Sequence, residues 1–243
     1  MIKQNYKKNV VVCTHECDFK NRMKISSLLN QTQQIGIEHC DSLGIRKQLS
    51  KTNTAFFIAK VLIEFYQEIY SDEELLILTE PYPPTKAIYR RYTDFYRISN
   101  NTCLASLNAS WVLVDVKNKK ILRTPPEQLN LNFTNDPKDR NTGQQIKLRR
   151  TDKDIFAGEE KALYSRCDAN GHLNNAEYAS IICDYLPSDM LSQKLPKHML
   201  IAYHHELLFG ECMKIFISEL AKNEYYFYGA KDEKKYFEAN ILF

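Results

Sequence analysis

The chain has 243 residues, of which 44% are hydrophobic, so it can form one or two domains with a substantial core. Charged residues make up 26% and the formal net charge is only +3, which does not indicate a nucleic-acid partner. The seven glycines include no G-x-G or G-x-x-x-x-G-K spacing, which excludes dinucleotide-binding and P-loop motifs. Fifteen tyrosines and 12 phenylalanines favour a protein rich in strands.

Signals for export, membrane insertion or metal binding are not found in the sequence. The basic residues 1–9 are followed by a short apolar run at Val10–Val12, too short for a signal peptide, and no stretch approaches the ~18 apolar residues of a membrane span. The seven cysteines form no C-x-x-C pair and no H-E-x-x-H sequence accompanies them, so we expect reduced thiols and no metal. These features predict a cytoplasmic protein.

The first half predicts an edge strand, one long helix and several antiparallel strands. Ser26 or Ser27 can cap the helix, and Gly44 can end it. The positions that carry the helical period are Leu28, Leu29, Ile35, His39 and Leu43. Aromatic and β-branched runs predict strands at residues 88–98, 103–116 and 121.

A polar connector follows. Residues 123–153 contain three prolines and many Asn, Asp and Lys residues without a sustained period, so we divide the chain into a repeat at 1–125, a linker at 126–153 and a repeat at 154–243. Alternating Leu129, Leu131 and Phe133 predict that part of the linker lies extended against a sheet.

The second half begins with Asp168, Asn170 and His172 at every second position of a loop that leads into a helix. Asn174 is the predicted N-cap, with Glu177 completing a capping box, and Pro187 ends the helix. Its apolar face is formed by Tyr178, Ile181, Ile182 and Tyr185. Strands are predicted at 201–209, which carries Glu206, and at 225–229 and 236–243.

The two halves are similar to each other. An offset of 150 residues aligns Cys17-Asp18 with Cys167-Asp168, and a weaker offset of 138 aligns Gln67-Glu68 with His205-Glu206. A long helix wrapped by an antiparallel sheet is the hotdog arrangement, so the predicted fold is an α+β double hotdog. The alternative is an ordinary α+β protein with chance self-similarity.

Polar groups that converge at a helix N-terminus suit a carbonyl oxygen that gains negative charge during acyl transfer, because free N–H groups lie there. The offset puts Lys20 at the position of Asn170 and Arg22 at that of His172, which predicts one active site per chain. The competing interpretation is a polar turn in which Asp168 and Asn170 satisfy their own backbone. A solvated strand glutamate is the corresponding alternative for Glu206, and His204 and His205 have no third zinc ligand at suitable spacing.

The segment at 164–178, Y-S-R-C-D-A-N-G-H-L-N-N-A-E-Y, resembles the signature of the acyl-acyl carrier protein (acyl-ACP) thioesterases. Further similarity covers nearly the whole chain, including Glu16–Asp18, Ser27–Asn30, His39, Leu104–Trp111, Asp115, Arg123 and Pro125. The resemblance implies a double hotdog that hydrolyses fatty acyl-ACP without a metal or cofactor, with Asp168, Asn170, His172 and Glu206 as the catalytic set. Some family members have a cysteine where this chain has Leu207, and no chemistry is assigned to Cys167.

The expected mechanism is attack by water on the thioester carbonyl. Glu206 would act as base, His172 and Asn170 would orient the water, and Asp168 would hold the loop. Backbone N–H groups near Asn174 and Asn175 would stabilise the oxyanion. The first repeat is expected to form the acyl-chain pocket.

The expected partner is an acidic acyl carrier protein, for which basic clusters provide candidate contacts. These clusters are Arg90 with Arg91, Lys119 with Lys120, and Lys147 with Arg149 and Arg150. Both a monomer and a homodimer are compatible with a fold that already contains the hotdog pairing.

Three other functions share parts of this pattern. A hotdog enoyl-thioester hydratase has proline after the asparagine and its histidine one place later, which Gly171 and His172 contradict. An acyl-coenzyme A thioesterase has the same chemistry and differs in carrier preference. A non-catalytic acyl-thioester-binding protein would bind without releasing thiol.

Overall fold

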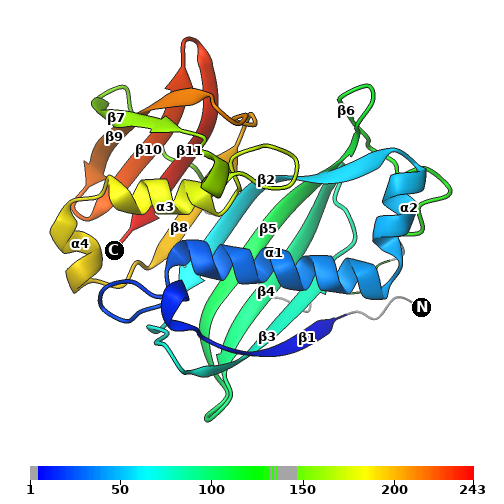
Figure 1. Ribbon diagram of the computed structural model, residues 1–243, viewed down its shortest axis with the longest axis horizontal. Coiled ribbons are helices and arrows are strands. Elements are labelled where there is room, and N and C mark those ends of the chain that lie inside the picture. Colours follow the sequence, from blue (N-terminus) through cyan, green and yellow to red (C-terminus); the bar gives the residue numbers. More distant parts are fainter. Residues whose placement is uncertain (1–4, 132, 134, 136–146) are drawn as a thin grey trace.

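The computed structural model describes residues 5–131, 133, 135 and 147–243. Within them, the first half contains strands β1 Tyr6–Val11, β2 Thr54–Phe65, β3 Glu74–Pro81, β4 Ile88–Arg97, β5 Thr102–Asp115 and β6 Lys120–Ile121. The second half contains β7 Ile155–Lys161, β8 His198–Tyr203, β9 Cys212–Ala221, β10 Glu224–Lys231 and β11 Lys234–Leu242. All these strands form one antiparallel sheet (Figure 1), in the order β1-β3-β4-β5-β2-β8-β11-β10-β9-β7, with β6 paired to β5.

The sheet order is the same in each half when read outward from the seam between β2 and β8. At the seam, residues 60–64 of β2 pair with residues 198–202 of β8. The offset of 150 residues takes the last residue of β1, Val11, to the last residue of β7, Lys161. The offset of 138 takes the first residue of β3, Glu74, to the first residue of β9, Cys212. The sequence repeat is therefore a structural repeat.

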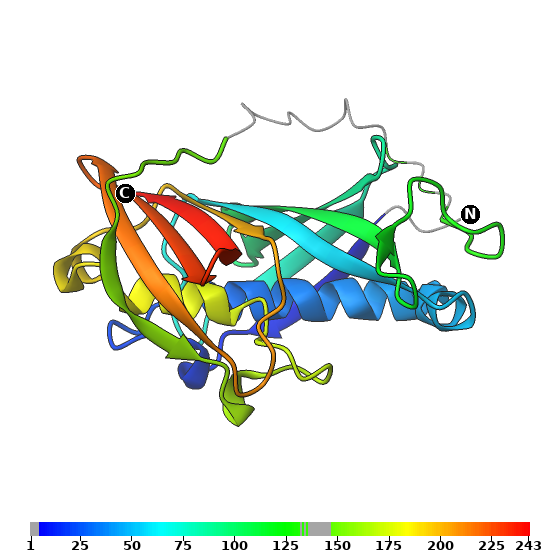
Figure 2. The ribbon, with the colours of Figure 1, turned by 90° about the horizontal axis from the view of Figure 1, so that it is seen from above.

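Two helices cover one face of this sheet, as the double hotdog prediction requires. These two are α1 Ile25–Ser42 and α3 Glu177–Asp184. The described residues also form the short helices α2 Ile45–Lys51 and α4 Ser188–Gln193 and the 3-10 turns η1 Thr14–Glu16 and η3 Tyr164–Arg166. Figure 2 shows α1 and α3 on the same side of the strands. No helix in the described part of the chain is long and apolar enough to cross a membrane.

Helix ends differ in part from the sequence prediction. Gly44 has φ 67° and ends α1 as expected, because glycine adopts this left-handed conformation without steric cost. The predicted start of this helix was wrong. Helix α1 begins at Ile25, and Ser27 Oγ donates to Glu16 O (2.9 Å) instead of capping the helix N-terminus. The short helices α2 and α4 were not predicted.

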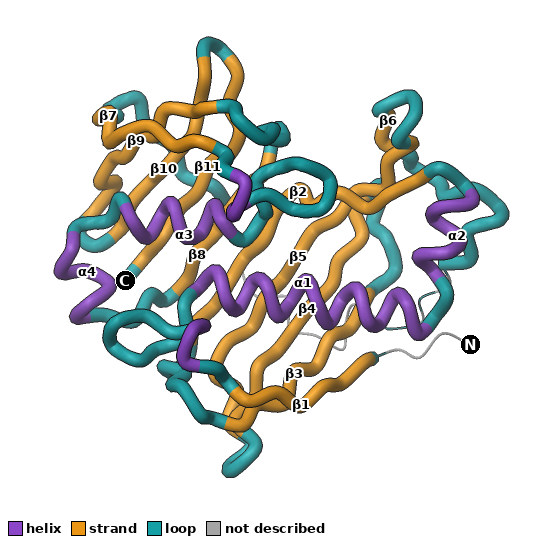
Figure 3. The backbone as a smooth tube through the Cα atoms, in the orientation of Figure 1, coloured by secondary structure: helices purple, strands orange, loops and turns teal. Residues whose placement is uncertain are grey.

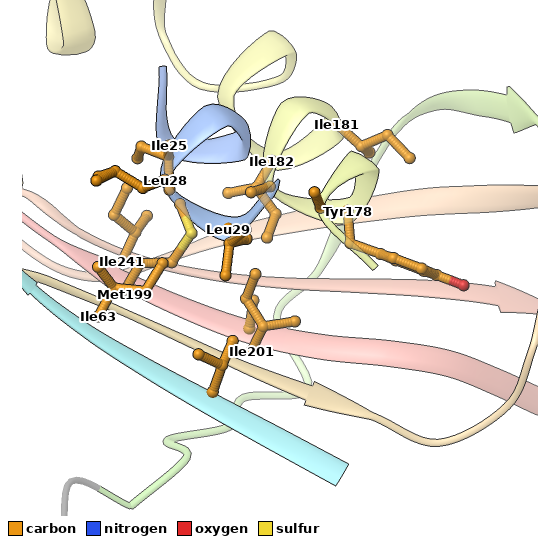
Figure 4. Packing of buried hydrophobic residues seen from close by; sticks show 14 of the residues in the cluster. Ile25, Leu28, Leu29, Ile63, Tyr178, Ile181, Ile182, Met199, Ile201 and Ile241 are labelled. Carbon is orange, nitrogen blue, oxygen red and sulfur yellow. The ribbon is translucent and has the colours of Figure 1, made fainter. Parts of the chain in front are cut away.

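One hydrophobic core joins both halves. Figure 4 shows Ile25, Leu28 and Leu29 of α1 and Tyr178, Ile181 and Ile182 of α3 above strand residues Ile63, Met199, Ile201 and Ile241. The α3 residues are at most 2% exposed, which agrees with the predicted apolar face. Because residues of both helices and of strands on both sides of the seam belong to one cluster, the halves share their buried apolar surface.

The strand predicted at 201–209 ends early, at Tyr203. The backbone N–H groups of His204 (2.9 Å) and His205 (3.2 Å) both donate to Tyr236 O, so the chain leaves the sheet there. Glu206 therefore lies in the loop after β8 and not on a strand.

The connector packs against both halves in different ways. Leu129 and Leu131 are buried with Ile45, Tyr89 and Leu113, and Phe133 contacts this cluster, without forming a strand there. Residues 147–154 cross the face opposite the helices (Figure 2), where the Asn240 side chain bonds both the N–H (2.7 Å) and the C=O (3.0 Å) of Arg149. Pro137 lies outside the described residues.

Candidate active site

The loop that precedes α3, residues 167–174, is closed by its own backbone. Asp168 N–H donates to His172 O (2.8 Å), and Gly171 N–H donates to Asp168 O (3.0 Å). Gly171 has φ 76°, which suits glycine and forms the tip of the turn. The loop is one of the teal segments in Figure 3, between η3 and α3.

The Asp168 side chain is engaged inside this loop. Its Oδ1 accepts the backbone N–H groups of Asn170 (2.9 Å) and His172 (3.1 Å), and its Oδ2 accepts Asn170 Nδ2 (3.2 Å). Such bonds also occur in a polar turn without catalytic function. Here they fix the backbone from which the His172 side chain projects.

His172 and Glu206 lie together although they are far apart in sequence. Leu173 N–H donates to Leu207 O (2.8 Å), and His172 forms an isolated bridge with Leu208, so the segment after β8 runs beside the loop. His172 Nδ1 is 3.2 Å from Glu206 Oε1, and the two side chains are 24% and 45% exposed. The structure thus contains a carboxylate–imidazole pair that solvent can reach.

The start of α3 differs from the predicted capping box. Asn174 N–H donates to Arg166 O (2.9 Å), and Asn174 Oδ1 accepts the N–H of Ala176 (3.0 Å). Glu177 binds the Arg166 side chain (3.1 Å) and not the Asn174 backbone. The helix therefore starts at Glu177, with Ala176 as its N-cap residue. Among the described residues, no hydrogen-bond partner is found for the Asn175 N–H, so it is an open donor at this end.

Tyr203 forms a hydrogen bond with the chain at the start of α3. Its hydroxyl donates to Asn175 O (3.1 Å), which fixes the orientation of the peptide after Asn175. Burial raises the pKa of Tyr203 well above its usual range, so the phenol keeps its proton and remains a donor.

Gln33, on α1 of the first half, was not predicted as a site residue. Its Nε2 donates to Asn174 Oδ1 (3.3 Å). Because that oxygen also accepts the Ala176 N–H, the Asn174 amide is held with Nδ2 directed away from both partners. Sequence spacing gave no signal for this contact, since Gln33 has an ordinary helical position and reaches the site only through docking of the halves.

The first half contains a counterpart of this loop with other side chains. Asp18 Oδ1 accepts the N–H groups of Lys20 (2.8 Å) and Arg22 (3.0 Å), as Asp168 Oδ1 does in the second half. Arg22 Nη1 lies 3.1 Å from Glu68 Oε1, at the positions of His172 and Glu206. The backbone is retained and the histidine is replaced.

Several other predicted polar residues have structural partners. Arg150 and His204 both bind the buried carboxylate of Glu238, with closest distances of 2.7 and 2.9 Å. Although burial opposes ionisation, hydrogen bonds from Arg150, Tyr226 and His204 hold the pKa of Glu238 well below its usual range.

The basic clusters proposed to contact the carrier protein are therefore partly occupied. Arg149 pairs with Glu224, and Arg91 turns toward α1, where its Nη1 is 3.1 Å from His39 Nδ1. Lys119 and Lys120 remain exposed after β5.

The described residues contain no group of three or more His, Cys, Asp or Glu side chains that could hold a metal ion. All seven cysteines are free thiols. Leu207, at the position where the resemblance places a cysteine in other members, is fully buried in the core.

Comparison with known proteins identifies the family. Residues 3–131 match the acyl-ACP thioesterase N-terminal domain, and residues 135–239 match the acyl-ACP thioesterase C-terminal domain. A search of curated protein sequences finds no significant match.

Solved structures of similar proteins cover almost the whole chain. An acyl-ACP thioesterase from Bacteroides thetaiotaomicron aligns with TM-score 0.87 and 18% identity over 98% of this chain and 97% of that one. A putative oleoyl thioesterase from Lactobacillus plantarum has TM-score 0.81 and 18% identity over 98% and 94%. The 12:0-ACP thioesterase of Umbellularia californica has TM-score 0.80 and 12% identity over 100% and 98%. At these identities the structures show the shared fold, and the two domain matches show the family. The chain therefore belongs to the acyl-ACP thioesterase family and is a thioester hydrolase.

Proposed function

We propose that this protein hydrolyses fatty acyl-ACP at the N-terminus of α3, with His172 and Glu206 activating a water molecule. The observation that carries the proposal is the 3.2 Å contact between His172 Nδ1 and Glu206 Oε1, three residues before Asn175 at the start of α3. A base, a group that orients it and an oxyanion donor are the parts that acyl transfer to water needs.

The contact favours a division of labour that differs from the sequence-based expectation. Because Glu206 faces Nδ1, the other ring nitrogen of His172 is left to accept a proton, and imidazole is the most common general base in enzymes. Glu206 then orients the ring and stabilises the imidazolium. Asp168 holds the loop, and Asn170 helps to position the water.

In the reaction, the water oxygen bonds to the thioester carbonyl carbon as His172 takes one proton. The carbonyl oxygen gains negative charge and accepts the Asn175 N–H, with the Asn174 side-chain amide as a second donor. Collapse of this intermediate breaks the carbon–sulfur bond, and the proton on His172 passes to the sulfur. The products are a fatty acid and the carrier thiol.

We assign the acyl chain to the first repeat and the chemistry to the second, with the division near residues 126–153. The free thiols support a cytoplasmic location. The active site is formed within one chain, so hydrolysis does not require a homodimer.

The experiment is release of free thiol from a chain-length series of acyl-ACPs, with acyl-coenzyme A in parallel. We expect faster turnover of the carrier protein thioesters. Equal or faster turnover of acyl-coenzyme A would indicate that coenzyme A is the preferred acyl carrier. Saturable binding of the thioester without thiol release would refute hydrolysis.

The base is identified with two variants. If Glu206→Ala keeps most of the rate while His172→Ala abolishes it, His172 is the base. Equal loss in Glu206→Gln and His172→Ala, with both proteins folded, would assign that role to Glu206.

A further inference from the structure

A cavity of about 470 Å³ lies beside the counterpart loop of the first half. It is formed by both halves, and its apolar lining includes Met23, Leu28, Phe65, Ile69, Leu191 and Leu195. Its volume is in the range of pockets that bind small molecules, about 300–1,000 Å³. Asp18 and Arg22, which line this cavity, correspond in the repeat to Asp168 and His172.

The counterpart loop cannot perform the proposed hydrolysis. Arginine does not give up its proton near neutral pH, so Arg22 cannot replace His172 as a base. Glu68 is held by Arg22 and by the Tyr70 hydroxyl, and these hydrogen bonds lower its pKa. A cavity has thus been retained beside a loop that lacks the catalytic base.

Charge is the main difference between the two loops. Asn170, His172 and Asn174 of the second half correspond to Lys20, Arg22 and Lys24 in the first, so three side chains without a fixed charge are replaced by three cations. Of these, Arg22 and Lys24 line the cavity, and Lys194 lines it from the second half.

The acidic groups at the cavity do not neutralise the two lysines. Asp18 and Glu68 both pair with Arg22, at 3.1 Å each. Asp184 also lines the cavity, and burial raises the pKa of its carboxyl. Lys194 Nζ donates to the neutral Asn223 side chain (2.8 Å), and Lys24 has no carboxylate partner within the described chain.

We propose that this cavity binds a long-chain carboxylate, with the aliphatic chain among its apolar side chains and the carboxylate at Lys24 and Lys194. A fatty acid has both required features, an apolar chain and one anionic head. Binding at this place needs no hydrolysis, so the proposal goes beyond the proposed reaction and is independent of its mechanism.

The test uses a fatty acid with a photoreactive diazirine in its chain, cross-linked to the full-length protein and mapped by peptide mass spectrometry. We expect labelled peptides containing residues 23–28 and 191–196, in the wild type and equally in His172→Ala. Labelling confined to other segments would overturn the proposal, whether or not the protein hydrolyses acyl-ACP.

Charge variants test the position of the head group. Lys24→Glu with Lys194→Glu should reduce labelling of those two segments by about fivefold or more, because two attractive contacts become repulsive. Lys20→Glu is the matched control, since it makes the same change in the same loop outside the cavity lining and should leave labelling unchanged.

The corresponding fatty alcohol, which has the same chain and diazirine but no charge, should label residues 23–28 and 191–196 less than the fatty acid does. Equal labelling of wild type and double variant, with unchanged circular dichroism, would exclude a carboxylate site at these lysines.

Discussion

Residues 18–24 and 168–174 have the same loop conformation and different chemistry. In both loops, the aspartate side chain accepts the backbone N–H groups of the residues two and four positions later. The residue three positions after the aspartate has a positive φ in both, 62° at Asn21 and 76° at Gly171. The alternating side chains are cations in one loop and Asn, His and Asn in the other. One aspartate and one left-handed residue are common to both backbones, whereas the alternating side chains determine what each loop can do.

The largest effect should come from the histidine that distinguishes the loops. His172→Ala should lower kcat/KM for acyl-ACP by about 100-fold or more, the usual contribution of a general base. Arg22→Met, at the equivalent position, should retain the wild-type value. Thiol release measures both, and a comparable loss in Arg22→Met would mean that the first loop contributes to catalysis.

Charge in the second half also stabilises the connector, whereas the first half holds it by apolar contacts. Glu238→Gln should lower the free energy of unfolding at pH 7 by about 2 kcal/mol, because Arg150 and His204 lose their carboxylate partner.

This effect should depend on pH. The folded pKa of Glu238 lies below the unfolded value of about 4.3, so its stabilisation is complete above that pH and is lost as pH falls toward the folded pKa. Urea unfolding should show the difference between the wild type and Glu238→Gln begin to shrink below about pH 5 and shrink further as the pH falls toward the folded pKa. A constant difference across this range would contradict a role for the charge.

Arg22→Met should reveal a structural role for the first loop. Arg22 binds Asp18, Glu68 and the backbone carbonyl of Leu191 in the other half, and its side chain is only 13% exposed. We expect a loss of about 1.5 kcal/mol in unfolding free energy, from these hydrogen bonds. Unchanged stability would show that the halves dock without this contact.

The smallest effect concerns Gln33 of α1, which contacts Asn174 in the proposed active site. Gln33→Ala should lower kcat about fivefold with little change in KM, because Asn174 loses the partner that orients its amide. Cys183→Ala changes the equivalent position of α3 and should have wild-type kcat. A rise in KM alone would indicate that Gln33 contacts substrate instead.

The sequence predicted what depends on local hydrogen bonding and on periodicity. The repeat, the Asp168 loop, the end of α1 at Gly44 and the apolar face of α3 were correct because nearby residues determine them.

Features that depend on contacts between distant segments were missed. Glu206 lies outside the strand predicted for it because the N–H groups of His204 and His205 both donate to Tyr236 O, which ends the strand before Glu206. The contacts of Gln33 with Asn174, and of Arg22 with Leu191, arise only when the halves dock. Neither hydrophobic periodicity nor the spacing of motifs in the sequence indicates such contacts between the halves.

The seam between β2 and β8 has a further consequence. Val61 pairs with Ile201 and Ile63 with Met199, and all four side chains are fully buried. Neither repeat can separate or unfold alone without exposing this apolar surface. We therefore expect thermal denaturation to be a single cooperative transition, in which destabilising either repeat lowers the amount of folded protein.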